Sequence, residues 1–132
     1  MKLISIYDEV NSPEILYNLL GERTPEQSIS HKEMPDWEDH VEFIKSRPYK
    51  AWYLIKADHG YVGSIYLTKL REIGIFIFNE HQGRGWASEA IGLLKILYPG
   101  RFLANVNPDN LPSLKLFEKL GGDIIQVTFE VK

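Results

Sequence analysis

The sequence predicts an α/β fold of the α+β kind, with a mixed, mainly antiparallel central sheet flanked by helices on both faces. Three strand-like segments follow one another between residues 51 and 78 with only short turns between them, which is typical of an antiparallel meander. Single helix-like segments then separate the later strands, which is typical of parallel crossovers. A chain of 132 residues without repeats is expected to form a single domain over residues 1–132.

The first predicted elements are a strand over residues 3–7 and a helix over residues 12–21. Apolar residues fill the strand, and leucines and isoleucines recur at helical spacing in the helix. Ser12 is expected to cap this helix, Pro13 suits its first turn, and Gly21 can end it.

Residues 22–35 are rich in Pro and Ser, which predicts a loop. Asp36 can cap a second helix, along which apolar and aromatic residues recur one turn apart. Pro48 is expected to end that helix.

The remaining elements alternate between strand-like and helix-like patterns. Asp58-His59-Gly60 is expected to be a hairpin turn, because Gly accepts the backbone angles that such turns need. The predicted strands cover residues 51–55, 61–67, 72–78, 102–106 and 124–131, and the predicted helices cover residues 88–97 and 112–120.

The composition excludes several classes of function. The net charge of −3 and the pI of about 5.8 argue against nucleic acid as a partner. The chain has no Cys and only 4 His, so neither a disulfide nor a metal site is expected. The first residues become polar too soon for a signal peptide, and no apolar run approaches the ~18 residues of a membrane span. The expectation is a cytoplasmic protein with no membrane partner.

The most informative segment reads Gln-Gly-Arg-Gly-Trp-Ala-Ser over residues 82–88, between a predicted strand and a predicted helix. A glycine turn that leads into a helix directs several unpaired backbone N–H groups at one point, where the helix dipole adds partial positive charge. Gly83 and Gly85 have no Cβ, so an anion can approach the backbone closely. The segment therefore predicts a site for phosphate or pyrophosphate.

Two well-known phosphate-binding motifs fit this segment less well. A Walker loop ends in Gly-Lys-Ser/Thr, which is absent here. The dinucleotide fingerprint needs a third glycine, where Ser88 stands, and an acidic residue about twenty positions later at the end of a strand. Asp109 has that distance but follows Asn107-Pro108 in a turn. A nucleotide-binding α/β domain is kept as an alternative.

A family resemblance covers the same segment. Gln82, Gly85 and Ala87 resemble the acyl-CoA pyrophosphate loop of the GNAT superfamily of N-acetyltransferases, Gln/Arg-x-x-Gly-x-Gly/Ala. Residues 107–121 resemble the second cofactor segment of that family, Asn-x-x-Ser/Ala-x-x-x-Tyr/Phe-x-x-x-Gly. The matching positions are Asn110, Ser113, Phe117 and Gly121. The resemblance is strong over residues 50–122 and implies the GNAT-like acyl-CoA N-acyltransferase fold.

The resemblance implies acetyl-CoA as co-substrate. Backbone N–H groups of the glycine loop would hold the pyrophosphate. The strand before the loop would pair with the pantetheine arm, in a gap between this strand and the one over residues 102–106, and a backbone N–H near Ile75 or Ile77 would face the thioester oxygen. The implied cofactor-binding residues are Ile75, Phe76, Ile77, Gln82, Gly83, Arg84, Gly85, Trp86, Ala87, Ser88, Asn110 and Ser113.

The same resemblance makes Glu72 the candidate general base of an N-acetyltransferase, because several members carry a Glu at the start of this strand. Asn105, where some members have their Glu, is no base, and Phe117 stands where many members have a proton-donating Tyr. A thiol pKa near ~8.5 makes departure as thiolate cost only about 1–2 kcal/mol at neutral pH. Deprotonating an ammonium of pKa ~10.4 costs about 4–5 kcal/mol, so the base matters more than the missing acid.

The acceptor would be a small-molecule amine or a protein amine. Loops shape the acceptor pocket in this fold, which makes His31, Glu33 and Trp37 the candidate substrate-binding residues, and the acidic residues around them favour a cationic amine. Members of the family usually end with two strands where one is predicted here. The sheet edge is therefore expected to be trimmed or to be completed by a partner subunit, a possible homodimer. The alternative from another class is a catalytically silent acyl-CoA-binding module that serves as a sensor or partner domain.

Overall fold

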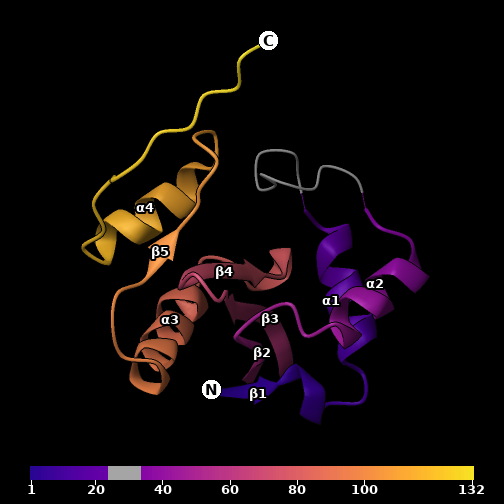
Figure 1. Ribbon diagram of the computed structural model, residues 1–132. Helices are drawn as coiled ribbons and strands as arrows, with labels where there is room; N and C mark the ends of the chain where they lie inside the picture. Colours follow the sequence, from indigo (N-terminus) through magenta and orange to yellow (C-terminus); the bar gives the residue numbers. More distant parts are fainter. Residues whose placement is uncertain (24–33) are drawn as a thin grey trace.

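The computed structural model describes residues 1–23 and 34–132, and within them a five-stranded sheet has helices on both faces (Figure 1). Helices α1 (Ser12–Gly21) and α2 (Trp37–Lys45) cover one face, and α3 (Trp86–Leu97) and α4 (Leu111–Lys119) lie on the other. The strands are β1 (Lys2–Ser5), β2 (Ala51–Ala57), β3 (Gly60–Leu67), β4 (Glu72–Ile77) and β5 (Leu103–Ala104). Two single-turn 3₁₀ helices, η1 (Ile6–Asp8) and η2 (Asn79–His81), follow β1 and β4.

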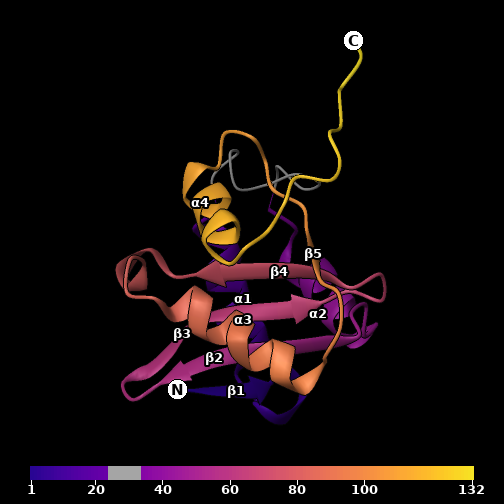
Figure 2. The ribbon, with the colours of Figure 1, turned by 90° about the vertical axis from the view of Figure 1, so that its left-hand side faces the viewer.

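The strands follow the chain order across the sheet, from β1 to β5. The first four strands pair antiparallel, whereas β5 pairs parallel to β4 after the crossover through α3. The mixed, mainly antiparallel sheet is therefore confirmed, and so is the crossover from β4 to β5 (Figure 2). In the described part of the chain, no helix is long and apolar enough to cross a membrane.

Two helix starts differ in detail from the prediction, whereas a third is confirmed. Asn11, and not Ser12, is the N-cap of α1, and Ser12 is buried as the first helical residue. Asp36 caps α2 as predicted, because its Oδ1 accepts the N–H of Asp39 at 2.8 Å. Helix α3 begins at Trp86, two residues earlier than predicted, because the turn already ends at Gly85.

The predicted strand over residues 124–131 is wrong. After α4 the chain has no regular secondary structure, and residues 121–132 are exposed. A strand needs the edge of a neighbouring strand, and β5 is only two residues long. Gly121 adopts a left-handed φ of 85° at the end of α4, and the chain then runs away from the sheet (Figures 1 and 2). The second predicted crossover therefore does not form within this chain.

Alternate residues of the central strands supply two apolar cores, one on each face of the sheet. Under α3, strand residues such as Ile55, Ile65 and Leu67 pack against Leu94 and are fully buried. Under α1 and α2, a smaller cluster comprises Ile6, Leu16, Ile44 and Leu54. Burying a large aliphatic side chain contributes about 1.5–3 kcal/mol, so both helical layers are fixed to the sheet by apolar contact.

The β4 backbone approaches an aromatic stack on the α1–α2 face. The rings of Tyr49 and Tyr66 are parallel within 2° at 3.9 Å between centroids. The Tyr66 ring lies so close to Gly74 that a Cβ there would come within 1.9 Å of its Cζ. Because Tyr49 blocks the retreat of this ring, only glycine fits at position 74.

Gly74→Ala should lower the free energy of unfolding by about 1–3 kcal/mol, since the added methyl group overpacks a filled site. Urea unfolding of both forms measures this difference. Gly92→Ala is the matched control, because Gly92 is exposed inside α3 with nothing near its Cβ position. That control should gain about 0.5–1 kcal/mol from the better helix propensity of Ala. Unchanged stability of Gly74→Ala would contradict a fixed Tyr66 ring.

A buried histidine joins the two N-terminal helices. His40 on α2 is 3 % exposed, and its Nε2 donates to the Pro13 carbonyl of α1 at 2.8 Å. Its ring packs against Tyr17 and Trp37 at 4.9 and 5.7 Å between centroids. Burial lowers the pKa of His40, and the hydrogen bond to Pro13 offsets this only in part. The folded protein therefore favours neutral His40.

Acidification should weaken the folded state through His40. The unfolded chain binds a proton near the ordinary histidine pKa of about 6.5, whereas the folded chain binds it only at lower pH. The stabilisation is complete above about pH 6.5 and is lost as the pH falls towards the folded pKa. Urea unfolding at about pH 7.5 and about pH 5.5 measures the loss. In His40→Gln, which keeps a donor for Pro13, the loss should be smaller; an equal loss would exclude His40 as its source.

Candidate functional site

Strands β4 and β5 separate soon after they meet. Their parallel pairing joins Glu72 to Leu103 and Ile73 to Ala104 and then stops. Among residues 1–23 and 34–132, no strand pairs with β4 on this side beyond Ile73. Helix α4 lies beyond this free edge of β4 (Figure 2). The pairing thus stops where the resemblance implies an opening between the two strands.

The free edge of β4 presents backbone groups to this opening. Phe78 N–H donates to the Val62 carbonyl of β3 at 2.9 Å. The backbone N–H and carbonyl groups of the even-numbered residues in this segment therefore point towards β3. Backbone groups alternate in direction along a strand, and therefore Ile75 and Ile77 direct their N–H and carbonyl groups to the open side. Their side chains pack with the core under α3. An extended amide-bearing chain could pair with this edge as an additional strand would.

The loop after β4 has the backbone geometry of an anion site. Gly83 and Gly85 have φ values of 76° and 83°, which side-chain-bearing residues rarely adopt, and a Cβ on either would meet no atom within 4 Å. Gly85 occupies the N-cap position of α3, where no side chain accepts a hydrogen bond from the first N–H groups of the helix. The N–H groups of Trp86, Ala87 and Ser88 thus lie in the uncapped first turn, where the helix dipole is positive. The arrangement fits a phosphate or pyrophosphate.

Two side chains of the loop that were expected to contact the cofactor, those of Gln82 and Trp86, contact the protein itself. Gln82 Nε2 donates to the Ile77 carbonyl at 3.1 Å and to Asn79 Oδ1 at 3.3 Å, so this side chain ties the loop to the end of β4. Arg84 is exposed. Trp86 packs against the core, and its buried Nε1 has no hydrogen-bond partner within the described residues. The backbone N–H groups at the start of α3, rather than these side chains, therefore form the candidate anion site.

Helix α4 presents its N-terminus with a side-chain cap. Asn110 Oδ1 accepts the N–H of Ser113 at 3.3 Å, so Asn110 is a helix cap. Its amide nitrogen is not used in this cap. Phe117 packs against the core and can supply no proton.

Glu72 is held at the point where β4 and β5 separate. Its Oε2 accepts a hydrogen bond from Asn105 Nδ2, and its Oε1 accepts one from Thr68 Oγ1 at 3.4 Å. Asn105 is the first residue after β5, immediately beyond the last paired residues of the two strands. Glu72 and Asn105 are the two positions at which members of the family carry a base. In this structure they are in contact, with Glu72 as the carboxylate and Asn105 as its hydrogen-bond donor.

An aromatic side chain, Tyr66, lies near Glu72 on the α1–α2 face. The Tyr66 ring lies over Gly74. Burial raises the pKa of the Tyr66 hydroxyl, and the negative charge of the nearby Glu72 carboxylate raises this pKa further. Phe76 follows Gly74 on this face of β4, and the Arg23 guanidinium lies 5.1 Å from the centre of the Phe76 ring. Sequence reasoning did not select Tyr66 or Asn105 as site residues. The strand pairing was the signal that could have found them, because residues beside Glu72 follow from the register.

The candidate acceptor residues are only partly described. His31 and Glu33 lie outside the described residues. Trp37 begins α2 and packs edge-to-face on Tyr17 at 5.2 Å between centroids. The aromatic contacts of Trp37 are thus with α1 and α2, and none is with β4.

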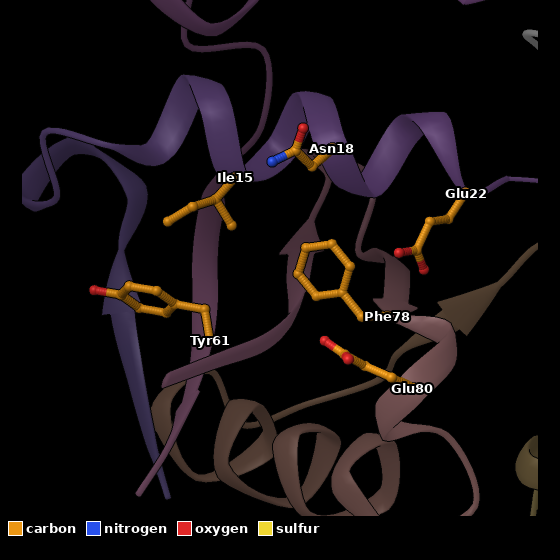
Figure 3. A pocket seen from close by; sticks show the side chains of 6 residues that line it. All are labelled: Ile15, Asn18, Glu22, Tyr61, Phe78 and Glu80. Atoms are coloured by element: carbon orange, nitrogen blue, oxygen red, sulfur yellow. The ribbon is translucent and has the colours of Figure 1, made fainter. Parts of the chain in front are cut away.

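A second concave surface lies between α1 and the end of β4 (Figure 3). This acidic groove has a volume of about 490 Å³ and is lined by Ile15, Asn18, Glu22, Tyr61, Phe78 and Glu80. Glu22 Oε1 accepts the Asn79 N–H at 2.7 Å, and Glu80 Oε1 lies 3.3 Å from His81 Nε2. Two carboxylates beside two aromatic rings suit a cationic group. Phe78 is six residues from Glu72, roughly 20 Å along an extended strand.

Comparisons with known proteins agree with this geometry. A family model described as an acetyltransferase (GNAT) domain matches residues 5–123. No curated protein matches the chain. A domain from Methanocaldococcus jannaschii has a similar solved structure, with 26% identity and a TM-score of 0.68, covering 91% of this chain and 86% of that one.

Two further solved structures share the fold at lower identity. A putative acetyltransferase from Salmonella typhimurium, solved with its cofactor acetyl-CoA, is 15% identical with a TM-score of 0.65; 91% of this chain and 76% of that chain are covered. A dodecameric spermidine N-acetyltransferase from Vibrio cholerae is 20% identical with a TM-score of 0.69, covering 91% and 77%.

Proposed function

The chain belongs to the GNAT acetyltransferase family, and on that premise we propose that it transfers the acetyl group of acetyl-CoA to a primary amine. The observation that carries the proposal is the position of Glu72. Its carboxylate is fixed by Asn105 and Thr68 where β4 and β5 separate, beside the free backbone edge of β4.

The geometry supports acetyl-CoA as the co-substrate. The uncapped start of α3, with Gly83 and Gly85, fits its pyrophosphate. The pantetheine arm carries amide groups that can pair with Ile75 and Ile77 at the free edge of β4. Asn110 would contact the arm from the α4 side with the amide nitrogen that its capping role leaves unused. The N–H of Ile75 or Ile77 would stabilise the thioester oxygen as it gains charge.

In the proposed step the amine nitrogen attacks the thioester carbonyl carbon. An N–C bond forms, the C–S bond breaks, and the proton of the nitrogen passes to Glu72, directly or through water. The sulfur leaves as thiolate and takes its proton from solvent, because Phe117 has none to give. Thiolate departure costs only about 1–2 kcal/mol near neutral pH, whereas amine deprotonation costs about 4–5 kcal/mol. The chain thus provides a group for the more costly proton transfer.

We propose a cationic acceptor. The first turn of α2 contains Glu38 and Asp39, and Glu22 and Glu80 line the acidic groove on the same face of the sheet. These carboxylates would attract an ammonium group and raise its concentration near the site. The Vibrio cholerae enzyme with the same fold acts on spermidine, a cationic amine.

The alternative function is a silent acyl-CoA-binding module. Phe117 and Asn105 favour it, since neither can act as acid or base. The two functions share the cofactor site and differ in turnover.

Acetyl-CoA should stabilise the protein against thermal unfolding. A ligand at about 100 times its Kd adds about 2.7 kcal/mol to the folded state. Gly85→Glu should abolish this gain, because a carboxylate would then stand beside the pyrophosphate. Gly92→Glu adds the same charge on an exposed turn of α3 and should keep the gain. NAD should give none. A gain with NAD and none with millimolar acetyl-CoA would favour the nucleotide-binding alternative.

Glu72→Gln should lower kcat by about 10²–10⁴-fold, the usual contribution of a general base, and should leave acetyl-CoA binding unchanged. Thiol release can be followed with a thiol-reactive dye without background, because the chain has no Cys. Glu118→Gln on the exposed side of α4 is the control. The panel should contain diamines, polyamines and neutral amines. Turnover of neutral amines alone would contradict the cationic acceptor, and acetyl-CoA binding without any turnover would favour the silent module.

A further inference from the structure

Gly74 leaves room for a side chain of the neighbouring strand to take its place. Tyr66 of β3 is the register partner of Gly74 in β4. The Cβ atoms of paired residues lie about 4.5–5.5 Å apart, and a tyrosine side chain is long enough to span that distance. The Tyr66 Cζ atom, which carries the hydroxyl group, lies 1.9 Å from where a Cβ on Gly74 would be. The Tyr66 hydroxyl therefore stands where β4 would otherwise present a side chain of its own.

This position lies where β4 and β5 separate. The pairing of the two strands ends at Ile73, so residue 74 is the first one of β4 beyond it. Side chains alternate along a strand, and position 74 therefore shares the α1–α2 face with Glu72 and Phe76. Tyr66 is half-buried and is not sealed into the core. The Tyr66 hydroxyl and the Glu72 carboxylate thus occupy neighbouring positions on one face of β4.

The Tyr66 hydroxyl carries a proton that it can donate. Burial raises the pKa of both Tyr66 and Tyr49 above the ordinary value of 10.0, so both are protonated at neutral pH. A hydrogen bond between the two hydroxyls raises the pKa of Tyr49 further and offsets part of the rise for Tyr66. These opposite effects are expected when Tyr49 donates and the Tyr66 oxygen accepts. The proton of Tyr66 then remains for a bound molecule.

The packing around Tyr66 fixes the direction of this donor. Its ring stacks on Tyr49 at 3.9 Å between centroids, and its outer end lies against the backbone of Gly74. The rings of Trp52 and Phe76 each lie 6.3 Å from it. A donor that is already fixed loses little conformational entropy when it binds. A ligand that leaves it unpaired forfeits a hydrogen bond that water would otherwise supply.

Tyr66 and Glu72 make opposite demands on a molecule that contacts both. An ionised carboxylate only accepts hydrogen bonds, whereas a protonated tyrosine hydroxyl can donate one. An alkyl amine offers N–H groups to Glu72, but its lone pair attacks the thioester and cannot also accept the Tyr66 proton. Successive positions on one face of a strand are roughly 6.6 Å apart. An acceptor with an oxygen atom close to its amine nitrogen can therefore meet both groups at once.

We propose that Tyr66 is a specificity-determining residue of the proposed acetyl transfer, and that the acceptor is an amino alcohol, a class that includes amino sugars. This inference rests on the proposed function. Glu72 accepts a hydrogen bond from the amine and then its proton, while Tyr66 donates to the oxygen on the neighbouring carbon atom. The two hydrogen bonds fix the direction from which the nitrogen attacks. Tyr66 keeps its proton throughout the reaction.

Matched pairs of amines test this inference by thiol release. Ethanolamine and propylamine have the same length and differ by a hydroxyl against a methyl group; 2-aminocyclohexanol and cyclohexylamine form a second pair. Tyr66→Phe keeps the ring over Gly74 and on Tyr49 but removes the donor. The ratio of kcat/KM, amino alcohol over alkyl amine, should be about 10–100-fold higher in the wild type than in Tyr66→Phe, because the site discriminates through a hydrogen bond. Comparing the two enzymes cancels the different basicity of the amines.

The loss should fall on the amino alcohol alone. Tyr66→Phe should keep the kcat/KM of the alkyl amine and the thermal stabilisation by acetyl-CoA. Tyr53→Phe is the matched control, because it removes a hydroxyl that bonds to Tyr98 on the α3 face of the sheet, and it should keep the wild-type ratio.

The possible outcomes separate this inference from the proposed function. An equal ratio in the wild type and in Tyr66→Phe would overturn the role of Tyr66 and leave the proposed function intact, since amines are then still acetylated. The same holds if Tyr66→Phe slows both amines of a pair equally, because the role of the hydroxyl is then not one of selection. Absence of turnover with every amine, despite acetyl-CoA binding, would overturn both.

Discussion

The pairing of β4 with β5 stops at Ile73 and Ala104, and this early stop determines what the rest of the molecule can do. A longer ladder would have used the N–H groups of Ile75 and Ile77 within the sheet. Because the ladder is short, those groups stay available along a free edge that leads from the glycine loop to Glu72. The same stop places Asn105 beside the Glu72 carboxylate, since Asn105 is the first residue released from the pairing.

The alternation of β4 divides the proposed chemistry between the two faces of the sheet. Odd-numbered side chains pack under α3 and fix the strand, while their backbone groups point into the opening. Even-numbered side chains, among them Glu72 and Phe76, point to the α1–α2 face, where the aromatic stack and the acidic groove lie. A co-substrate that pairs with backbone and an acceptor that meets side chains can therefore approach the same strand from different directions.

The brevity of β5 also has a consequence on its outer side. A two-residue strand offers too little edge to hold residues 124–131 after the turn at Gly121, so an alternating segment with strong strand propensity is left exposed. The opening on one side of β5 and the unpaired edge on the other thus have one origin.

Local patterns in the sequence determined most of the fold. Alternation and helical spacing gave β1 to β4 and all four helices to within a few residues, because these signals are local. The glycine loop was predicted from its sequence because its backbone geometry depends only on its own residues. The tertiary structure decided three features, namely the absence of the last predicted strand, the Glu72–Asn105 contact and the Tyr66–Gly74 packing. A strand forms only where a neighbour offers an edge, and residues 33 positions apart meet only through the register of the sheet. Sequence alone therefore determined most of the regular segments and indicated a candidate anion site, whereas the tertiary structure decided which side chains meet, since that depends on where each pairing stops.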